Sequence, residues 1–298
     1  MRVLEAILRD SPSLSFEFYP PRGPDGAADL VRRVRRLEAL APDFVSVTYN
    51  AGGAGAAAEA SLETTAALGD ATRAARVAHL TLAGQTRDQL AAAVGRFVET
   101  GVEGFMALRG DPPGGPAAAW AHTAGGFTYA AELVELVRAL CDLPVGVAAF
   151  PHGHPTAKTL ARDAEVLAAK QAAGASFALS QVVFDAADYF RLVERAVQAG
   201  ASLPIVPGIM PVTANAKLAR LELFAGAPLP PRLVERVRQA ADAAQVDRVG
   251  LEWAWELGRD LLAGGAPGLH FYTLNSGLAA EEIWRRLAGV DGAADGNR

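Results

Sequence analysis

Residues 177–211 contain, in order, FALSQVVF (177–184), DYFRLVERAVQAG (188–200) and PIVPGIMP (204–211). The first and third segments are short and almost wholly apolar, which is typical of strands that are buried on both faces of a sheet. The second segment repeats apolar residues three and four positions apart and ends on a glycine, which predicts a helix with one buried face. This stretch therefore predicts a strand, a helix and a second strand in the same sheet.

The same alternation occurs along the whole chain. Helical periodicity is found at 30–40, 130–140 and 163–174, and 229–264 has room for two helices. Further strands are predicted at 14–20, 44–50, 77–83, 104–111, 145–151 and 268–275. Eight strand–helix units in about 280 residues favour an α/β fold of the closed (β/α)8 (TIM) barrel type over an open doubly wound sheet. We expect a single barrel domain over 1–290 and a disordered tail over 291–298.

Composition excludes several classes of protein. The chain has 298 residues, of which 51% are hydrophobic and 20% charged, so it can bury a large core without disulfides. The formal net charge of −5 disfavours a nucleic-acid partner. Cys141 is the single cysteine, and we expect it to be a buried, inert thiol. Neither a signal peptide nor an apolar run long enough for a membrane helix is visible, so the sequence predicts a cytoplasmic protein without membrane contact.

Polar residues recur near the ends of the predicted strands. Since the active sites of (β/α)8 barrels lie at the carboxyl ends of the strands, these residues are candidates for the site. They are Glu17, Thr48, Tyr49, His79, Thr81, Arg109, Asp111, His152, His154, Gln181 and Asn275.

Glu17 is the strongest candidate for acid–base chemistry. It stands between Phe16 and Phe18, and apolar surroundings favour the protonated form of a carboxyl group. Such a group can act as a general acid near neutral pH. The structural alternative is a salt bridge across the barrel, for example to Arg109.

The Arg109-Gly110-Asp111 segment ends the fourth predicted strand. Gly110 allows a flat ligand to approach the backbone closely, and Asp111 would face the barrel mouth. The alternative is that Asp111 only initiates a turn before Pro112.

Two further patterns have competing explanations. His152 and His154 are two positions apart, but they lack a third ligand in a recognised spacing, so we do not expect a metal site. Asp163 and Lys170 lie two turns apart on one face of a predicted helix, where a solvated charge pair is the simplest explanation.

Taken together and in order, the strand-end motifs resemble the 5,10-methylenetetrahydrofolate reductase family in its short bacterial form. The resemblance covers about residues 13–290 and rests on SFEFYPPRG, FVSVTYNAGG, AHLTLAG, GFMALRGDPP, AAFPHGHP, LSQVVFD, PIVPGIMPVT and GLHFYTLN. It implies a (β/α)8 barrel with non-covalent FAD and a ping-pong reduction of methylenetetrahydrofolate by NADH or NADPH. The product would supply methyl groups for methionine synthesis. It also implies a homo-oligomer.

The resemblance assigns roles to individual residues. Glu17 would protonate N10 of the folate, Asp111 would act near the flavin and the pterin, and Gln181 would hydrogen-bond the pterin. Further substrate contacts fall on Leu221 and Leu274. Flavin-binding positions fall on Thr48, His79, Arg109, Gly110, Asp111, Tyr129, Ala149, Phe150, His154, Asp163 and Lys170.

The chain departs from the family pattern at several of these positions. Phe150 stands where the family usually has Tyr, Ser180 where it has Thr, and Leu221 where it often has an aromatic residue. Two alternatives remain open at this point. One is a flavin-free reductase with direct hydride transfer, and the other is a barrel that binds folate or flavin without catalysis.

Overall fold

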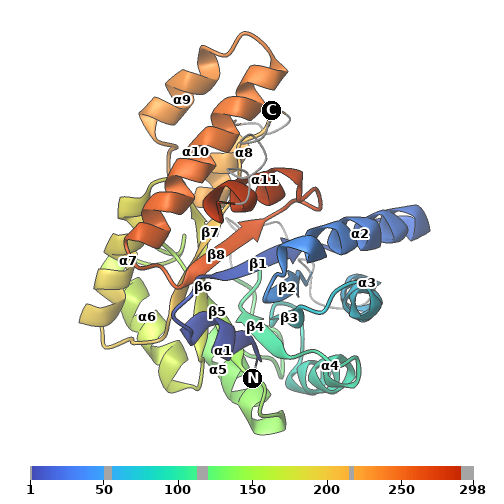
Figure 1. The fold of residues 1–298 in the computed structure, drawn as a ribbon. Coiled ribbons are helices and arrows are strands. Elements are labelled where there is room, and N and C mark those ends of the chain that lie inside the picture. The colour runs from blue at the N-terminus through green and yellow to red at the C-terminus, as the bar shows by residue number, and fades with distance from the viewer. Residues whose placement is uncertain (1, 50–55, 113–119, 215–217, 290–298) are drawn as a thin grey trace.

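Eight parallel strands form a closed barrel in the order β1 to β8 (Figure 1). The computed structural model describes residues 2–49, 56–112, 120–214 and 218–289. The strands are β1 (Ser13–Phe18), β2 (Phe44–Val47), β3 (Ala75–Thr81), β4 (Gly104–Leu108), β5 (Val145–Ala149), β6 (Phe177–Val183), β7 (Ile205–Ile209) and β8 (Gly268–Tyr272). Each lies within or overlaps one predicted segment, so the predicted (β/α)8 barrel is confirmed.

Helix α1 precedes β1, and the other helices follow the strands and surround the barrel. They are α1 (Arg2–Leu8), α2 (Gly23–Leu37), α3 (Ala56–Ala67), α4 (Arg87–Glu99), α5 (Ala130–Leu140), α6 (Leu160–Ala172), α7 (Ala186–Gln198), α8 (Leu218–Ala225), α9 (Pro231–Arg238), α10 (Ala243–Ala263) and α11 (Leu278–Leu287). The pair of helices predicted within 229–264 corresponds to α9 and α10. The predicted tail over 291–298 lies outside the described residues.

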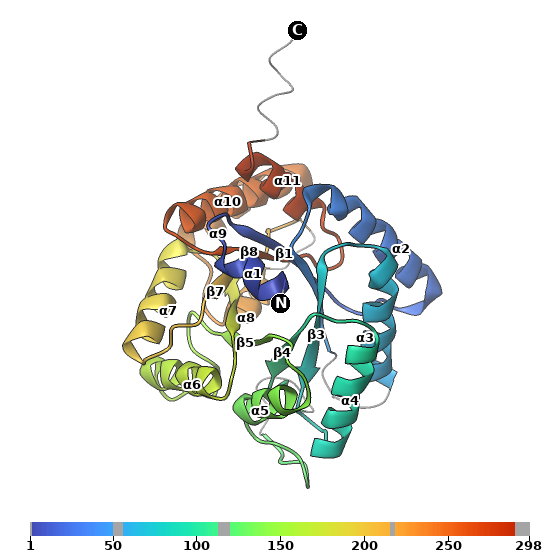
Figure 2. The same ribbon diagram turned by 60° about the horizontal axis from the view of Figure 1, so that its bottom comes forward.

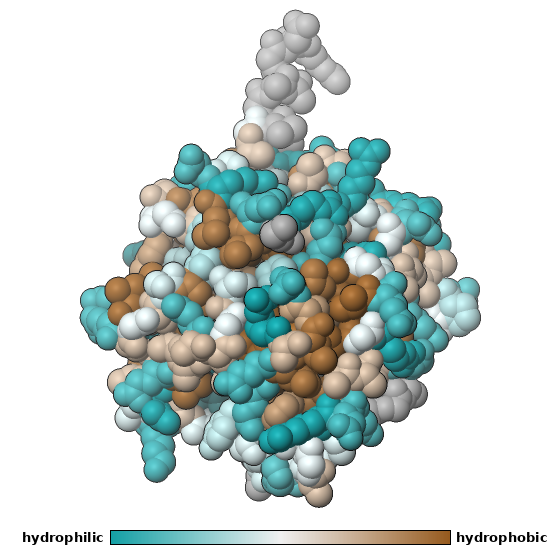
Figure 3. All heavy atoms as spheres, turned by 90° about the horizontal axis from the view of Figure 1, so that it is seen from below, coloured by the Kyte–Doolittle hydropathy of each residue, from teal (hydrophilic) through white to brown (hydrophobic). Residues whose placement is uncertain are grey.

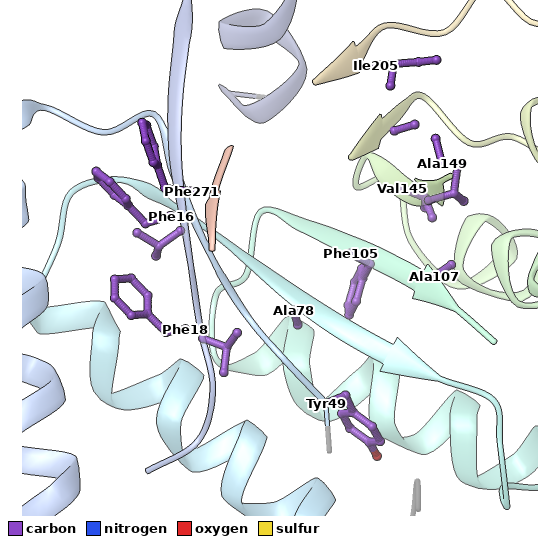
Figure 4. Packing of buried hydrophobic residues seen from close by; sticks show 14 of the residues in the cluster. Phe16, Phe18, Tyr49, Ala78, Phe105, Ala107, Val145, Ala149, Ile205 and Phe271 are labelled. Atoms are coloured by element: carbon purple, nitrogen blue, oxygen red, sulfur yellow. The ribbon is translucent and has the colours of Figure 1, made fainter. Parts of the chain in front are cut away.

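The strands bury both of their faces, which explains their apolar sequences. Their outward side chains pack against the helices in one large cluster, which includes Phe16, Phe105, Ala149 and Phe271 (Figure 4). A second cluster joins inward residues such as Phe44 and other strand side chains to α1. The alternation along each strand therefore decides which residues can reach the barrel interior.

Helix α1 covers the amino-terminal end of the barrel. Its Val3 and Ile7 side chains join the inner cluster, and Arg2 forms an ion pair with Glu103, just before β4. Figure 2 shows α1 near the barrel axis. On the face seen from below, hydrophobic residues gather near the centre among hydrophilic ones (Figure 3). With this end closed, the carboxyl end of the barrel is the end available for a ligand.

Two expectations from the sequence concern the cysteine and membrane-spanning helices. Cys141 is only partly buried, at the C-terminus of α5, so the prediction of a buried thiol is wrong. It ends the helix, where the side chain is only partly covered. Of the helices that the structure describes, none combines the length and the hydropathy needed to cross a bilayer.

Candidate active site

Three side chains from β1, β3 and β8 meet inside the barrel, toward its carboxyl end. Oε2 of Glu17 lies 3.7 Å from Nε2 of His79 and 3.8 Å from Nε2 of His270. The Glu17 side chain keeps 19% of its surface exposed, so it is also accessible from the mouth. Both Nε2 atoms are buried and have no hydrogen-bond partner in the described part of the chain. We call Glu17, His79 and His270 the acid cluster.

The surroundings of the acid cluster control its charge. Burial lowers the pKa of His79 to about 4, against the attraction of Glu17 and with a small contribution from His270, so this ring is neutral at pH 7. His270 places Nδ1 2.8 Å from the buried Oγ of Ser15. Burial, and secondarily the charge of Glu17, raise the pKa of Tyr272 well above its ordinary value. The cluster thus combines an accessible carboxyl group with the neutral His79 ring and with a second imidazole that contacts Ser15, an arrangement suited to proton transfer.

The expected alternative for Glu17 is not found. Among the described residues, no ion pair joins Glu17 to Arg109. The Arg109 guanidinium instead lies 4.6 Å from the ring centroid of Trp120.

A second group of charges lies between the ends of β4 and β5 and helix α6. Lys170 donates a hydrogen bond from Nζ to the Ala148 carbonyl at 2.9 Å, and burial lowers its pKa to about 8. Asp163 accepts a hydrogen bond from the backbone N–H of His154 at 3.2 Å, and burial raises its pKa. We call Arg109, His154, Asp163 and Lys170 the cationic cluster, after its two positively charged side chains, Arg109 and Lys170. The alternative of a solvated Asp163–Lys170 pair is wrong, because both side chains turn toward β5 and the loop that follows it.

The two histidines of the PHGHP segment have different partners. His154 accepts hydrogen bonds at Nδ1 from the backbone and hydroxyl of Thr156, and its ring lies 5.0 Å from that of Phe150. Burial lowers the pKa of His154 to about 4, with Arg109 and Lys170 adding to the effect. His152 instead lies 3.3 Å from Asp188. Within the described ranges, no group of three His, Cys, Asp or Glu residues is arranged to hold a metal ion.

The backbone just after β4 packs tightly against the end of β3, which requires glycine at position 110. Gly110 has φ +75°, and a Cβ atom at this position would lie 2.8 Å from Cβ of Thr81. Arg109 keeps its buried Nε without a hydrogen-bond partner in the part of the chain described. The two cationic side chains, Arg109 and Lys170, fit the phosphates of a dinucleotide cofactor. Asp111 follows directly and is exposed.

The three predicted substrate residues differ in how much of their side chain is exposed. Gln181 is partly exposed, and its Oε1 accepts a hydrogen bond from the backbone N–H of Val182 at 2.9 Å. Leu274 is 44% exposed, in the loop after β8. Leu221 is only 1% exposed and packs in a cluster with Val182 and Met210. Only Gln181 and Leu274 therefore present surface to a ligand in this structure.

Other predicted positions lie at the edge of the site or outside it. Thr48 is partly exposed just beyond β2, and Tyr129 is 66% exposed at the start of α5. The Ala149 side chain belongs to the outer cluster (Figure 4), so it points away from the barrel interior. Tyr49 also joins the outer cluster, and Asn275 bonds the backbone of Tyr19.

Sequence reasoning missed three residues of this region. They are Ser15 and His270, which lie inside β1 and β8, and Tyr272, which is the last residue of β8. The available signal was a polar residue within an otherwise apolar strand, most clearly His270 in GLHFYTLN. Burying such a group without a partner is unfavourable, which makes its presence informative.

Fold and site together define a (β/α)8-barrel protein with an acid cluster and a cationic cluster at the barrel mouth. The family model for methylenetetrahydrofolate reductase matches residues 2–288, and the chain belongs to this family.

Similar proteins agree with this assignment. The 5,10-methylenetetrahydrofolate reductase of Escherichia coli (strain K12) is 33% identical over 264 residues, which cover 88% of this chain and 86% of the relative. Methylenetetrahydrofolate reductase (NADH) 1 of Arabidopsis thaliana is 30% identical over 94% of this chain, which spans 49% of that relative. The chain thus has about half the length of the plant relative.

A solved structure supports the fold. An uncharacterized protein from Clostridium thermocellum, described as binding two copies of 5-methyl-5,6,7,8-tetrahydrofolic acid, superposes with a TM-score of 0.69. The match covers 97% of this chain and 100% of that one, at 13% identity, a level that supports the fold alone.

Proposed function

We propose that this chain reduces 5,10-methylenetetrahydrofolate to 5-methyltetrahydrofolate, with NADH or NADPH as electron donor in a ping-pong reaction. Family membership supports the substrate, and the plant relative is named as an NADH form. The 5-methyltetrahydrofolic acid bound by the structural neighbour has the chemistry of the proposed product. The single observation that carries the proposal is the acid cluster, with a carboxyl group between two buried imidazoles.

Glu17 would supply the proton that the folate needs. Protonation of N10 makes it a better leaving group, so the bond between N10 and the bridging carbon breaks and the five-membered ring opens. The neutral His79 ring lets Glu17 donate without a fixed positive charge beside it. Hydrogen bonding from the imidazoles would then stabilise the carboxylate that remains.

The cationic cluster is the proposed site for FAD, which when bound carries the hydride between nicotinamide and folate. Arg109 and Lys170 would hold phosphate groups, and Asp163 would bind ribityl hydroxyls. Gly110 would let the flavin ring lie against the backbone, with Asp111 near its edge. His79, Thr48, Tyr129, Ala149, Phe150 and His154 complete the proposed contacts, with Ala149 offering its backbone.

Gln181 and Leu274 would orient the folate, with Leu221 as a more distant contact. Gln181 supplies hydrogen bonds for the pterin, and Leu274 supplies exposed apolar surface. A role for Leu221 requires that α8 or its neighbours move, because its side chain is buried in this structure.

The visible spectrum of the purified protein tests the proposal. We expect a flavin band that bleaches on addition of NADH or NADPH and returns on addition of methylenetetrahydrofolate. A colourless but active protein would refute the flavin-dependent reaction and indicate a flavin-free reductase. A colourless and inactive protein, even with FAD added, would indicate a binding barrel without catalysis. Homo-oligomer formation and a cytoplasmic location stay predictions, which light scattering and cell fractionation would test.

A further inference from the structure

Strand β6 contains one extra residue opposite β7. Leu179 pairs with Val206, and Val182 pairs with Gly208, so three steps along β6 match two steps along β7. The shift places a β-bulge at Ser180 and Gln181. Bulges bend a strand and redirect a side chain, and they are common beside active sites.

Packing shows that the bulge changes the facing of the strand. Ala178 and Val183 are five residues apart, and a regular strand would place them on opposite faces. Both nevertheless belong to the outer cluster between the barrel and its helices. Leu179, by contrast, belongs to the inner cluster. The direction of the Gln181 side chain therefore depends on how the bulge is held.

The adjacent strand β7 and the next strand, β8, hold Ser180 through hydrogen bonds. The backbone N–H of Gly208 in β7 donates to Oγ of Ser180 at 2.9 Å. The hydroxyl group of Tyr272 in β8 donates to the carbonyl oxygen of Ser180 at 2.8 Å. Ser180 is fully buried, so losing either bond would leave an unpaired polar group away from water.

The Tyr272 ring reaches Ser180 only because position 208 is a glycine. A Cβ atom at Gly208 would lie 2.4 Å from Cε2 of Tyr272 and 2.6 Å from the Ser180 carbonyl oxygen. The three residues therefore fit together as one unit across β6, β7 and β8. The high pKa of Tyr272 keeps its hydroxyl group protonated, and so a donor, throughout the working pH range.

The Gln181 side chain is oriented by the same segment. Because its Oε1 accepts the Val182 backbone N–H, the amide N–H groups are the ones left to meet a ligand. A ligand that matches these donors carries a hydrogen-bond acceptor, such as a nitrogen or oxygen atom on a heteroaromatic ring.

We propose that Tyr272 is a positioning residue that acts through Ser180, holding the β6 bulge so that Gln181 presents its amide N–H groups to an acceptor on the pterin ring. This inference rests on the proposed function for the identity of the ligand. The clamp itself, formed by Tyr272, Ser180 and Gly208, can be tested without any ligand.

Tyr272→Phe removes only the hydroxyl group, and Tyr189→Phe is its matched control. The hydroxyl group of Tyr189 in α7 also donates to a backbone carbonyl, that of Ile205, at 2.8 Å. We expect a similar loss of stability in both variants. Only Tyr272→Phe should weaken binding of 5-methyltetrahydrofolate to the purified holoenzyme, by up to about tenfold, the equivalent of one hydrogen bond. Reduction by the nicotinamide donor should be unchanged in Tyr189→Phe.

A double-mutant cycle separates positioning from direct contact. If Tyr272 acts through Gln181, Tyr272→Phe should change affinity little in a Gln181→Ala background. Additive losses would show that Tyr272 contacts the ligand itself and would overturn the inference. Equal affinities of wild type and Tyr272→Phe would also overturn it.

Hydrogen exchange tests the clamp independently of folate. Peptides that cover β6 should exchange faster in Tyr272→Phe than in Tyr189→Phe, since the bulge loses one of its two anchors. Unchanged exchange in β6 would refute the clamp. If the wild-type protein binds no folate but the two variants still differ in exchange, the proposed function is refuted and the clamp is supported.

Discussion

Nε2 of His79 lies 3.7 Å from Oε2 of Glu17, and the imidazole is neutral at pH 7 because burial lowers its pKa to about 4. A protonated ring in this place would attract the negative charge of an ionised carboxylate, whereas the neutral ring does not. This relationship links β1 to β3 and is the basis of the first two predictions.

Replacing Glu17 by Gln should separate the two halves of the proposed reaction. The amide has nearly the same shape but cannot donate a carboxyl proton. We expect Glu17→Gln to retain flavin and to be reduced by NADH or NADPH, while folate reduction slows by about 10²–10⁴. Stopped-flow measurement of each half-reaction checks this, and equal slowing of both would refute the acid role.

Stability should fall when the pH decreases from about 6.5 to about 4. The unfolded His79 ring binds a proton near pH 6.5 and the folded one near 4, so acid favours the unfolded chain in this window. Above pH 6.5 the stability is not reduced by His79, and at pH 4 the loss due to His79 amounts to about 3 kcal/mol. His154 acts in the same direction.

Urea denaturation of His79→Gln across pH 4–7 tests this dependence. The variant should lose less stability than wild type as the pH falls, because comparing the two proteins cancels the contributions of other groups. His122→Gln, which replaces an exposed histidine, is the control. Parallel curves for His79→Gln and wild type would contradict the prediction.

Loss of either charge at Asp163 or Lys170 should release FAD. Asp163→Ala and Lys170→Ala remove the proposed contacts to ribityl and phosphate groups, whereas each disturbs only one backbone hydrogen bond of the fold, worth about 1 kcal/mol. The ratio of flavin to protein absorbance after gel filtration measures the effect, alongside urea midpoints. Lys158→Ala, at an exposed position, is the control. Wild-type flavin content in both variants would remove these residues from the cofactor site.

Restoring the tyrosine hydroxyl at position 150 should tighten FAD binding. Phe150 packs against His154 and lies 5.9 Å from Nζ of Lys170, measured to the ring centroid. We expect Phe150→Tyr to raise FAD affinity by up to about tenfold, the value of one net hydrogen bond. Titration of the apo-protein measures it. An unchanged affinity with undisturbed stability would mean that the site is built around Phe150.

Local sequence determined the eight strands and the order of the helices. An apolar run of four to seven residues and a spacing of three and four between apolar residues are properties of short segments, so they can be read without knowing the fold. The same reasoning placed Glu17 at the carboxyl end of its strand, between two phenylalanines that pack outward. It also singled out Gly110, for close approach of a ligand, and the structure adds that this residue has a positive φ.

Only the tertiary structure decided which side chains meet. His270 faces Glu17 because β8 pairs with β1 in the register that sets Ser15 beside His270 and Glu17 beside Tyr272. That register depends on closing the barrel between the first and last strands, which are some 250 residues apart in sequence and share no local signal. The β6 bulge is of the same kind, because one extra residue reverses the facing of the strand and is anchored from β7 and β8. Strand pairing and barrel closure are long-range properties. They bring together residues that the sequence of each segment could identify only singly.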